Sequence, residues 1–202
     1  AVCWGTDAYG QLGDGTRTAG SVPTAVSGLA GGVVSIGAGR YFSCALTTDG
    51  GVTCWGDNGY GQLGDGTTTD RATPGDVTGL TSGVAALSVG RNHLCALTTA
   101  GGVKCWGHNS YGQVGDGTSS NRSTPVDVTG LTSGVVAIAA LGYHSCAVTT
   151  AGAAKCWGYN TDGQLGDGTT TLHTTAVDVS GLASGVLSMT GGTYFACALR
   201  TG

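Results

Sequence analysis

The chain has 202 residues, of which 40 are glycine and 8 are cysteine, and its formal net charge is −4. Glutamate is absent and one residue in five is glycine, which argues against a helical bundle because helices need strong helix formers. The apolar runs are only a few residues long and the arginines are scattered, so we expect no membrane insertion and no nucleic-acid binding.

A repeat of 51 residues runs through the sequence. The tripeptide Cys-Trp-Gly recurs at this interval, and so does the heptapeptide GQLGDGT, with leucine replaced by valine in one copy. The tripeptides begin at Cys3, Cys54, Cys105 and Cys156, and the heptapeptides at Gly10, Gly61, Gly112 and Gly163. The chain is two residues short of four whole units, so we expect one domain over residues 1–202, or a four-blade portion of a larger ring or assembly.

Short strands follow one another within each unit. The β-branched run Val33–Ala38 predicts a first strand, and the alternation of side chains over Tyr41–Thr48 predicts a second. An Asp-Gly pair then marks a tight turn, and Gly51–Trp55 returns as the antiparallel partner. A long connection rich in glycine and threonine leads to a further short strand around Asp76–Thr78.

Three to four strands in a period of this length are typical of a β-propeller blade. One such sheet cannot bury both of its faces alone, so neighbouring sheets have to stack side by side around an axis. The sequence therefore predicts an all-β fold, a β-propeller built from four repeats with four-stranded blades. The tryptophan of each repeat is expected to fill the gap between adjacent blades rather than to serve as a platform for a sugar.

Six cysteines lie ten residues apart in pairs across the predicted turns, and we expect the disulfides Cys44–Cys54, Cys95–Cys105 and Cys146–Cys156. Directly opposed strand residues are close enough for such a bond. The spacings typical of zinc sites and of the Cys-x-x-Cys redox motif are absent. Disulfides indicate an oxidising compartment, so we expect an extracellular or cell-surface protein whose secretion signal has already been removed.

Cys3 and Cys197 belong to matching strands at opposite ends of the chain. If they pair, the termini share one blade and close the ring, and closure within one chain avoids the entropy of bringing two chains together. Two alternatives remain open. Two chains could exchange their split blades, or the two cysteines could pair with those of neighbouring copies in a head-to-tail array.

The repeat, written GxNxxGQLGDGT…PxxVxGL…V…GxxHxCALTxxGxVxCWG, resembles the regulator of chromosome condensation repeat family, best over Gly56–Thr67, Pro74–Leu80 and Gly90–Gly107. The resemblance covers the chain in four copies and implies a propeller of four-stranded blades, typically seven, often closed by a terminal strand. Bacterial secreted members with a Cys-Trp-Gly motif and paired cysteines are more similar to this chain than the eukaryotic founder is. The founder's nucleotide-exchange and chromatin-binding activities use an inserted wedge and basic segments that this chain lacks. The use of one propeller face for protein binding is what the family shares.

Loop positions that vary between repeats are where a specific partner would bind. We single out Tyr60, Arg71, Tyr111 and Arg122 as candidate contact residues, because amphipathic aromatic and arginine side chains are enriched in interfaces. The fourth repeat has Asp162 in place of the loop tyrosine, which argues against a four-fold aromatic patch. Asn121 begins a glycosylation sequon, which matters only in a host that glycosylates asparagine.

The aspartates of the GDGT segments are weak candidates for calcium ligands: Asp14, Asp65, Asp116 and Asp167. An aspartate followed by glycine is also the standard turn signal, and this structural interpretation is the stronger one. His93 and His144 share their repeat position with Phe42 and Phe195, so we expect them to pack in the core and not to bind a metal.

No catalytic motif, phosphate-binding loop or cofactor motif is found, so we expect no enzyme activity and no cofactor. The sequence favours a secreted scaffold that binds a protein partner, or further copies of itself, through loop faces and the split terminal blade. Two alternatives stay open: a lectin-like glycan-binding propeller, suggested by the tryptophans and loop tyrosines, and an extracellular module stabilised by calcium.

Overall fold

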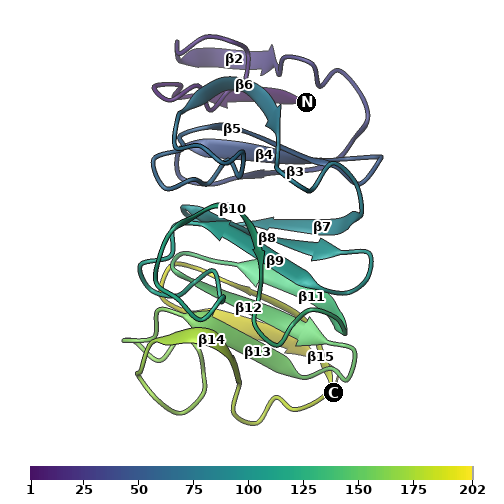
Figure 1. The fold of residues 1–202 in the computed structure, drawn as a ribbon, viewed down its shortest axis with the longest axis vertical. Coiled ribbons are helices and arrows are strands. Elements are labelled where there is room, and N and C mark those ends of the chain that lie inside the picture. The colour runs from purple at the N-terminus through teal and green to yellow at the C-terminus, as the bar shows by residue number, and fades with distance from the viewer. Residues whose placement is uncertain (202) are drawn as a thin grey trace.

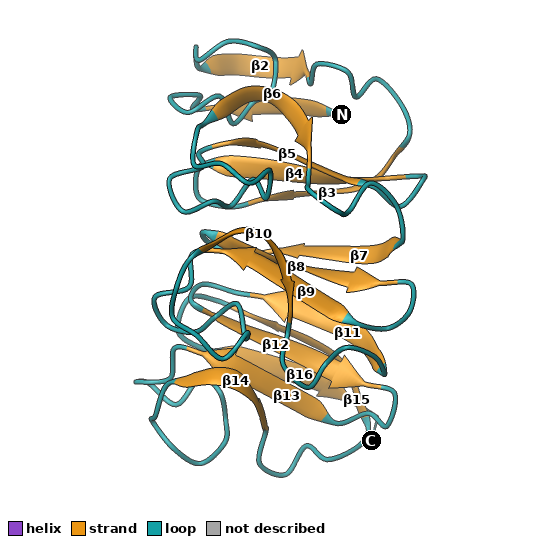
Figure 2. Cartoon of the chain, in the orientation of Figure 1, coloured by secondary structure: helices purple, strands orange, loops and turns teal. Residues whose placement is uncertain are grey.

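The computed structural model describes residues 1–201, and every regular element in that range is a β-strand (Figure 1, Figure 2). None of these residues belongs to a helix long and apolar enough to cross a membrane. The all-β expectation is therefore confirmed. The strands form antiparallel sheets that follow one another along the longest axis of the molecule.

Three sheets have four strands each, in sequence order. Blade A consists of β3 (Val33–Ala38), β4 (Phe42–Thr47), β5 (Val52–Gly56) and β6 (Arg71–Asp76). Blade B consists of β7 (Val84–Val89), β8 (His93–Thr98), β9 (Val103–Gly107) and β10 (Arg122–Asp127). Blade C consists of β11 (Val135–Ala140), β12 (His144–Thr149), β13 (Ala154–Gly158) and β14 (His173–Asp178).

A two-stranded sheet lies at each end of this stack. The N-terminal half-blade contains β1 (Val2–Gly5) and β2 (Gly20–Ala25), which correspond to the third and fourth strands of a complete blade. The C-terminal half-blade contains β15 (Val186–Gly191) and β16 (Ala196–Arg200), which correspond to the first and second strands. The two half-blades together hold the four strands of one blade.

The central hairpin of each blade has the predicted turn and the predicted disulfide. In blade A, Cys44 lies opposite Cys54 in the β4–β5 register, and Gly50 closes the turn with a φ of 75°. The bonds Cys44–Cys54, Cys95–Cys105 and Cys146–Cys156 each join Cα atoms 4.1 Å apart. These three disulfides are confirmed.

The fourth strand lies earlier than the sequence suggested, over Arg71–Asp76 instead of Asp76–Thr78. Val77 is fully buried, and its N–H donates to the Val52 carbonyl at 3.0 Å. The Thr78 N–H donates to the Gly64 carbonyl at 2.9 Å. Beyond the end of β6, Val77 therefore keeps a main-chain bond to β5, and Thr78 ties the chain to the preceding loop.

A buried tryptophan joins each blade to the repeat before it. Trp55, Trp106 and Trp157 have no exposed surface, and their indole N–H groups donate to the main-chain carbonyls of the preceding glutamines at 2.9, 3.0 and 2.9 Å. These glutamines are Gln11, Gln62 and Gln113. The predicted role as core residues between blades is confirmed for these three tryptophans, whereas Trp4 is 61% exposed.

The tryptophans also explain one glycine in the GDGT-containing loops of the first three repeats. A Cβ atom added to Gly64 would lie 2.7 Å from the Trp106 indole nitrogen, and the φ of Gly64 is 71°. No other residue type satisfies both the close approach and the left-handed backbone at low cost.

The ring stays open within one chain. The two chain ends lie at opposite ends of the stack (Figure 1), and Cys3 and Cys197 are both unpaired among the residues described. The expected closure, with one blade shared by both termini of the same chain, is therefore not what the structure shows. Sheets stacked one after another form an arc, and four repeats do not carry this arc far enough to bring its ends together.

Trp106→Ala should lower the free energy of unfolding by about 3–5 kcal/mol, because it leaves a cavity between two blades and an unpaired Gln62 carbonyl. Trp4 occupies the same repeat position but is 61% exposed, so Trp4→Ala should cost less than about 1 kcal/mol. Chemical denaturation followed by circular dichroism, at low protein concentration, measures both. Equal losses in the two variants would contradict this account of the blade interfaces.

Candidate functional site

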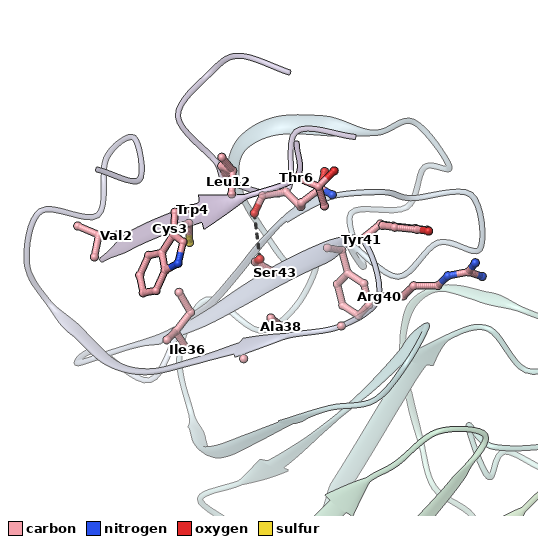
Figure 3. A pocket seen from close by; sticks show the side chains of 14 residues that line it. Val2, Cys3, Trp4, Thr6, Leu12, Ile36, Ala38, Arg40, Tyr41 and Ser43 are labelled. Carbon is pink, nitrogen blue, oxygen red and sulfur yellow. Dashed lines mark hydrogen bonds between the residues drawn. The ribbon is translucent and has the colours of Figure 1, made fainter. Parts of the chain in front are cut away.

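The free edges of the two half-blades are the first candidate surface. Next to β1 lies a cavity of about 370 Å³, lined by Val2, Cys3 and Trp4 on one side and by Ile36 of β3 on the other (Figure 3). Val2 is 54% exposed, Trp4 61% and Ile36 48%. The cavity occupies the position that the first two strands of a complete blade would take.

The C-terminal half-blade has the complementary surface. Phe195 is 59% exposed and Leu199 62%, whereas Phe42, at the position of Phe195 in blade A, is 1% exposed. Cys197 of β16 is exposed, and Cys3 of β1 is partly buried. Burial raises the pKa of the Cys3 thiol above its ordinary value, although the nearby amino terminus opposes this effect. Each half-blade thus exposes apolar side chains and a thiol along an unpaired strand edge.

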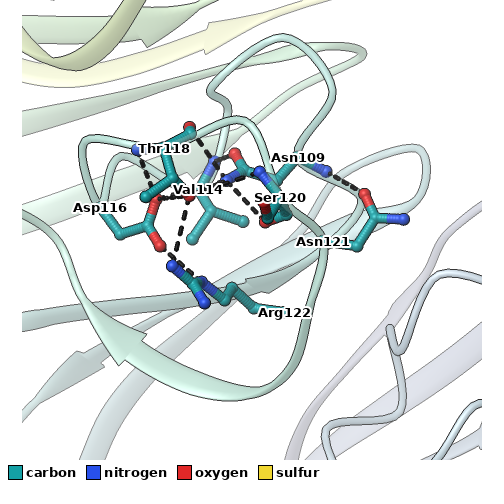
Figure 4. Close-up of polar contacts among 7 residues, drawn as sticks. All are labelled: Asn109, Val114, Asp116, Thr118, Ser120, Asn121 and Arg122. Atoms are coloured by element: carbon teal, nitrogen blue, oxygen red, sulfur yellow. Dashed lines mark hydrogen bonds and ion pairs between the residues drawn. The ribbon is translucent and has the colours of Figure 1, made fainter.

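The GDGT loops are organised by an asparagine amide, as blade B shows (Figure 4). The Asn109 side-chain NH₂ donates to the Asp116 carboxylate at 3.3 Å and to the carbonyls of Thr118 and Ser120 at 3.1 and 2.9 Å. Its carbonyl oxygen accepts the Val114 N–H at 2.9 Å. The side-chain NH₂ group therefore lies among the loop oxygen atoms, in the place that a cation bound to those atoms would take.

The same arrangement recurs around Asn58 and Asn160, beside Asp65 and Asp167. Partial burial raises the pKa of Asp116, but hydrogen bonds from Thr118 and Arg122 outweigh it and hold the pKa below its ordinary value. Within residues 1–201 no three histidine, cysteine or acidic side chains converge to hold a metal ion. The calcium candidates therefore lie in hydrogen-bonded turns.

Asp7 is the exception among these loops. It takes the position of Asn58 in the first repeat, where it is 1% exposed and accepts the Leu12 N–H at 2.8 Å. A carboxylate cannot donate to the carbonyls and to Asp14, as the amide does in the other repeats. The first loop therefore combines two carboxylates, Asp7 and Asp14, with no amide at its centre.

The four predicted contact residues divide into two groups. Arg71 and Arg122 form ion pairs with Asp65 and Asp116, the latter through the guanidinium Nε. These pairs belong to the GDGT loops of their own repeats. Tyr60 and Tyr111 instead lie in an aromatic surface that extends across several blades.

This surface, the tyrosine strip, contains all seven tyrosines of the chain: Tyr9, Tyr41, Tyr60, Tyr111, Tyr143, Tyr159 and Tyr194. Their rings approach one another across repeats, with centroids 5.0 Å apart for Tyr9–Tyr41 and for Tyr111–Tyr159. Arg40 lies over the Tyr41 ring at 4.9 Å. Aromatic and arginine side chains in this arrangement are typical of binding surfaces.

The sequence did not reveal the strip because its members come from three different positions of the repeat. Asp162 removes the tyrosine from one position, but Tyr159, three residues earlier, supplies a ring instead. The loops that carry Tyr41 and Tyr143 are joined between blades by main-chain bonds, from Arg40 N–H to Arg91 O at 2.9 Å and from Arg91 N–H to Leu141 O at 3.1 Å. The sequence signal that could have predicted the strip is the number of tyrosines in the loops before and after the central hairpin of each repeat.

The buried histidines His93 and His144 lie in the core, as predicted from the shared position with phenylalanine. The Ser145 hydroxyl donates to the Gln113 carbonyl at 2.9 Å, so the His93 Nε2–H is the donor in its 2.8 Å bond to that hydroxyl. Neither ring nitrogen of His144 has a partner among residues 1–201. Burial lowers the pKa of His93 to about 3 and that of His144 to about 4.

Asp7→Asn should raise the melting temperature, with a gain in stability of about 1 kcal/mol, because the amide supplies donors that the other three loops have. The reverse change in a complete loop, Asn109→Asp, should lower stability by at least as much. Thermal unfolding in chelator and in excess calcium measures both. A melting temperature that rises with calcium in the wild type, and loses this rise in Asp7→Asn, would mean that the first loop holds a cation.

His144→Phe should make the fold less sensitive to acid. The unfolded state takes up a proton near the ordinary histidine pKa while the folded state does not, so stability falls as the pH drops from neutrality toward the lowered folded-state value. At about pH 5 this loss is about 2 kcal/mol for each buried histidine. Denaturation at neutral pH and at about pH 5 should show a smaller difference for the variant; an unchanged difference would contradict the assignment.

Two models described as regulator of chromosome condensation (RCC1) repeat match the chain. One matches residues 3–46, 49–97 and 100–148, and the other residues 33–62, 84–113 and 135–164. Curated relatives include the human E3 ubiquitin-protein ligase HERC2, which is 38% identical over 172 residues that make up 83% of this chain and 4% of that protein. The Arabidopsis thaliana ultraviolet-B receptor UVR8 is 34% identical over 168 residues, 82% of this chain and 38% of that protein. The chain thus spans less than two fifths of the length of these relatives.

Solved structures show the same fold. Human WBSCR16 superposes with a TM-score of 0.83 and 22% identity over 98% of this chain and 54% of that protein. Yeast RCC1 (Prp20), in its complex with Kap60, superposes with a TM-score of 0.80 and 20% identity over 100% of this chain and 50% of that protein. This chain therefore corresponds to about half of each of these structures, which accounts for its open arc.

Proposed function

The chain belongs to the regulator of chromosome condensation (RCC1) repeat family, and from this premise we propose that it is a non-catalytic binding scaffold that assembles through its split blade. The observation that carries the proposal is the pair of complementary half-blades with unpaired strand edges. The single domain proposed for residues 1–202 is a half-ring, completed when β1 of one unit pairs with β16 of another. A second copy of this chain supplies such an edge.

The register of the complete blades defines how the two edges would join. In blade A, Cys44 lies opposite Cys54 and Ser43 opposite Trp55. The equivalent pairing places Cys197 opposite Cys3 and Ala196 opposite Trp4. Trp4, now 61% exposed, would then become a core residue as Trp55 is, with 0% exposed. Burial of apolar side chains and a disulfide across the joint would both stabilise the assembly.

The loop faces supply the binding part of the proposal. The yeast protein whose structure resembles this chain is described by its binding to Gsp1p and histones, and in a second structure it is bound to Kap60. These partners belong to that protein, and no basic surface for nucleic acid is evident in this acidic chain. Tyr60 and Tyr111 are our candidate contacts for a protein partner, and Arg71 and Arg122 flank the outer loops. The three disulfides favour an extracellular or cell-surface location.

A mixing experiment tests the assembly. Cys3→Ser alone and Cys197→Ser alone each lack one partner of the proposed bridge, so neither should form the Cys3–Cys197 bond. A mixture of the two variants should give a disulfide-linked dimer under oxidising conditions, because one chain keeps Cys197 and the other keeps Cys3. Intact mass without reductant and peptide mapping of the bridge provide the measurement.

The double variant Cys3→Ser/Cys197→Ser is the control for the remaining disulfides. Equal crosslinking in the single variants and in their mixture would contradict the specific joint. A chain that stays monomeric in the mixture, as judged by light scattering, would overturn the proposed assembly.

A further inference from the structure

A cavity of about 460 Å³ interrupts the tyrosine strip where the N-terminal half-blade, blade A and blade B meet. Three tyrosines line it: Tyr9 from the N-terminal half-blade, and Tyr41 and Tyr60 from the loops of blade A. Arg40, Asp57 and Asn92 supply its polar groups. We call this cavity the tyrosine pocket.

The pocket coincides with two substitutions between repeats: one is Asp57, and the other is Asn92, which stands where the other three repeats have a tyrosine. His108 and Tyr159 occupy the repeat position of Asp57, and each places a ring in the corresponding gap. The His108 ring lies 4.6 Å from Tyr60, and the Tyr159 ring lies 5.0 Å from Tyr111. The small carboxylate of Asp57 leaves the first gap open between aromatic walls.

The polar side chains that line the pocket keep hydrogen-bonding capacity for a ligand. Asn92 is 8% exposed and contributes to the lining of the pocket. Arg40 forms no ion pair in this range and lies over the Tyr41 ring. Asp57 accepts bonds from Gly59 N–H at 3.1 Å and from the Gln62 amide at 2.7 Å, so its carboxylate is held in place with acceptor capacity left.

We infer that the tyrosine pocket binds a neutral sugar residue of a glycan. The C–H faces of a pyranose ring pack against the tyrosine rings, while its hydroxyl groups both donate and accept hydrogen bonds. They can donate to Asp57, accept from Arg40, and do both with Asn92. A cationic ligand would meet the Arg40 guanidinium and an anionic ligand the Asp57 carboxylate, so a neutral polyhydroxyl ligand fits both. The volume is within the range of small-molecule sites.

One substitution can fill the pocket without changing the fold, because the same repeat position already holds a larger side chain in the next repeat. Asp57→His reproduces His108, whose Nδ1 accepts from Gln113 as Asp57 accepts from Gln62. Tyr159→His is the matched control, since it places the same histidine at the same repeat position in a gap that contains no residue of the pocket. Tyr60→Ala removes one aromatic wall. Thermal unfolding shows whether each variant is folded.

The probes are methyl α-glucoside, methyl α-mannoside and methyl β-galactoside, measured by saturation-transfer NMR and titration calorimetry on the full chain. We expect the wild type to bind at least one of them, and Asp57→His and Tyr60→Ala to bind it at least about tenfold more weakly. Tyr159→His should bind as the wild type does.

Three results would overturn the inference. The first is no binding of any of the three glycosides, and the second is an equal loss of binding in Tyr159→His. The third is displacement of the sugar signal by free lysine or glutamate at comparable concentration, which would mean a charged ligand. The binding test is separate from the assembly test, because Cys3→Ser/Cys197→Ser keeps every residue of the pocket.

Discussion

The contact between each tryptophan and the repeat before it is the constraint on which the structure depends. A four-stranded blade has two apolar faces, and it covers one of them only when its indole packs over the previous loop and donates to a glutamine carbonyl, as Trp106 does with Gln62. The glycine that receives the ring, Gly64, has to lack a side chain. Each blade is therefore stabilised by its neighbours. A repeat at the end of the series has a neighbour on one side only, so part of its apolar surface stays exposed. Trp4 has no preceding repeat within residues 1–201 and stays exposed.

The same interfaces also decide where specific chemistry can arise. Positions that carry the blade, such as the paired cysteines and the loop asparagines, are nearly invariant between repeats, because each is tied to the neighbouring strand or loop. Positions at the rim of the interface tolerate change, and substitutions there alter the surface. Asp57, His108 and Tyr159 occupy one position, yet the first leaves a cavity and the other two fill it. Variation between copies thus creates a cavity at one of the equivalent gaps of a scaffold that repeats itself.

Much of the fold could be predicted from the sequence because its signals are local. The spacing of Cys44 and Cys54 across an Asp-Gly turn defines a hairpin and its register, and the period defines the blade. The open ring and the tyrosine strip could not be predicted in this way. The strip joins residues such as Tyr111 and Tyr159 that belong to different repeat positions and different blades, so no comparison of aligned copies brings them together. The angle between successive blades, which determines whether Cys3 meets Cys197, is a property of the stacked sheets and leaves no local pattern.

The split blade and the tyrosine pocket are physically connected through Tyr9. This residue forms one wall of the pocket, and it belongs to the N-terminal half-blade, which is a two-stranded sheet with one unpaired edge. A two-stranded sheet is less stable than a complete blade, because fewer main-chain bonds and less apolar surface hold it. Strands added to β1 would fix the half-blade against blade A, and with it the position of the Tyr9 ring relative to Tyr41 and Tyr60. On the two proposals made above, assembly and sugar binding would stabilise the same arrangement of the first repeat, and each would favour the other by the reciprocity of linked equilibria.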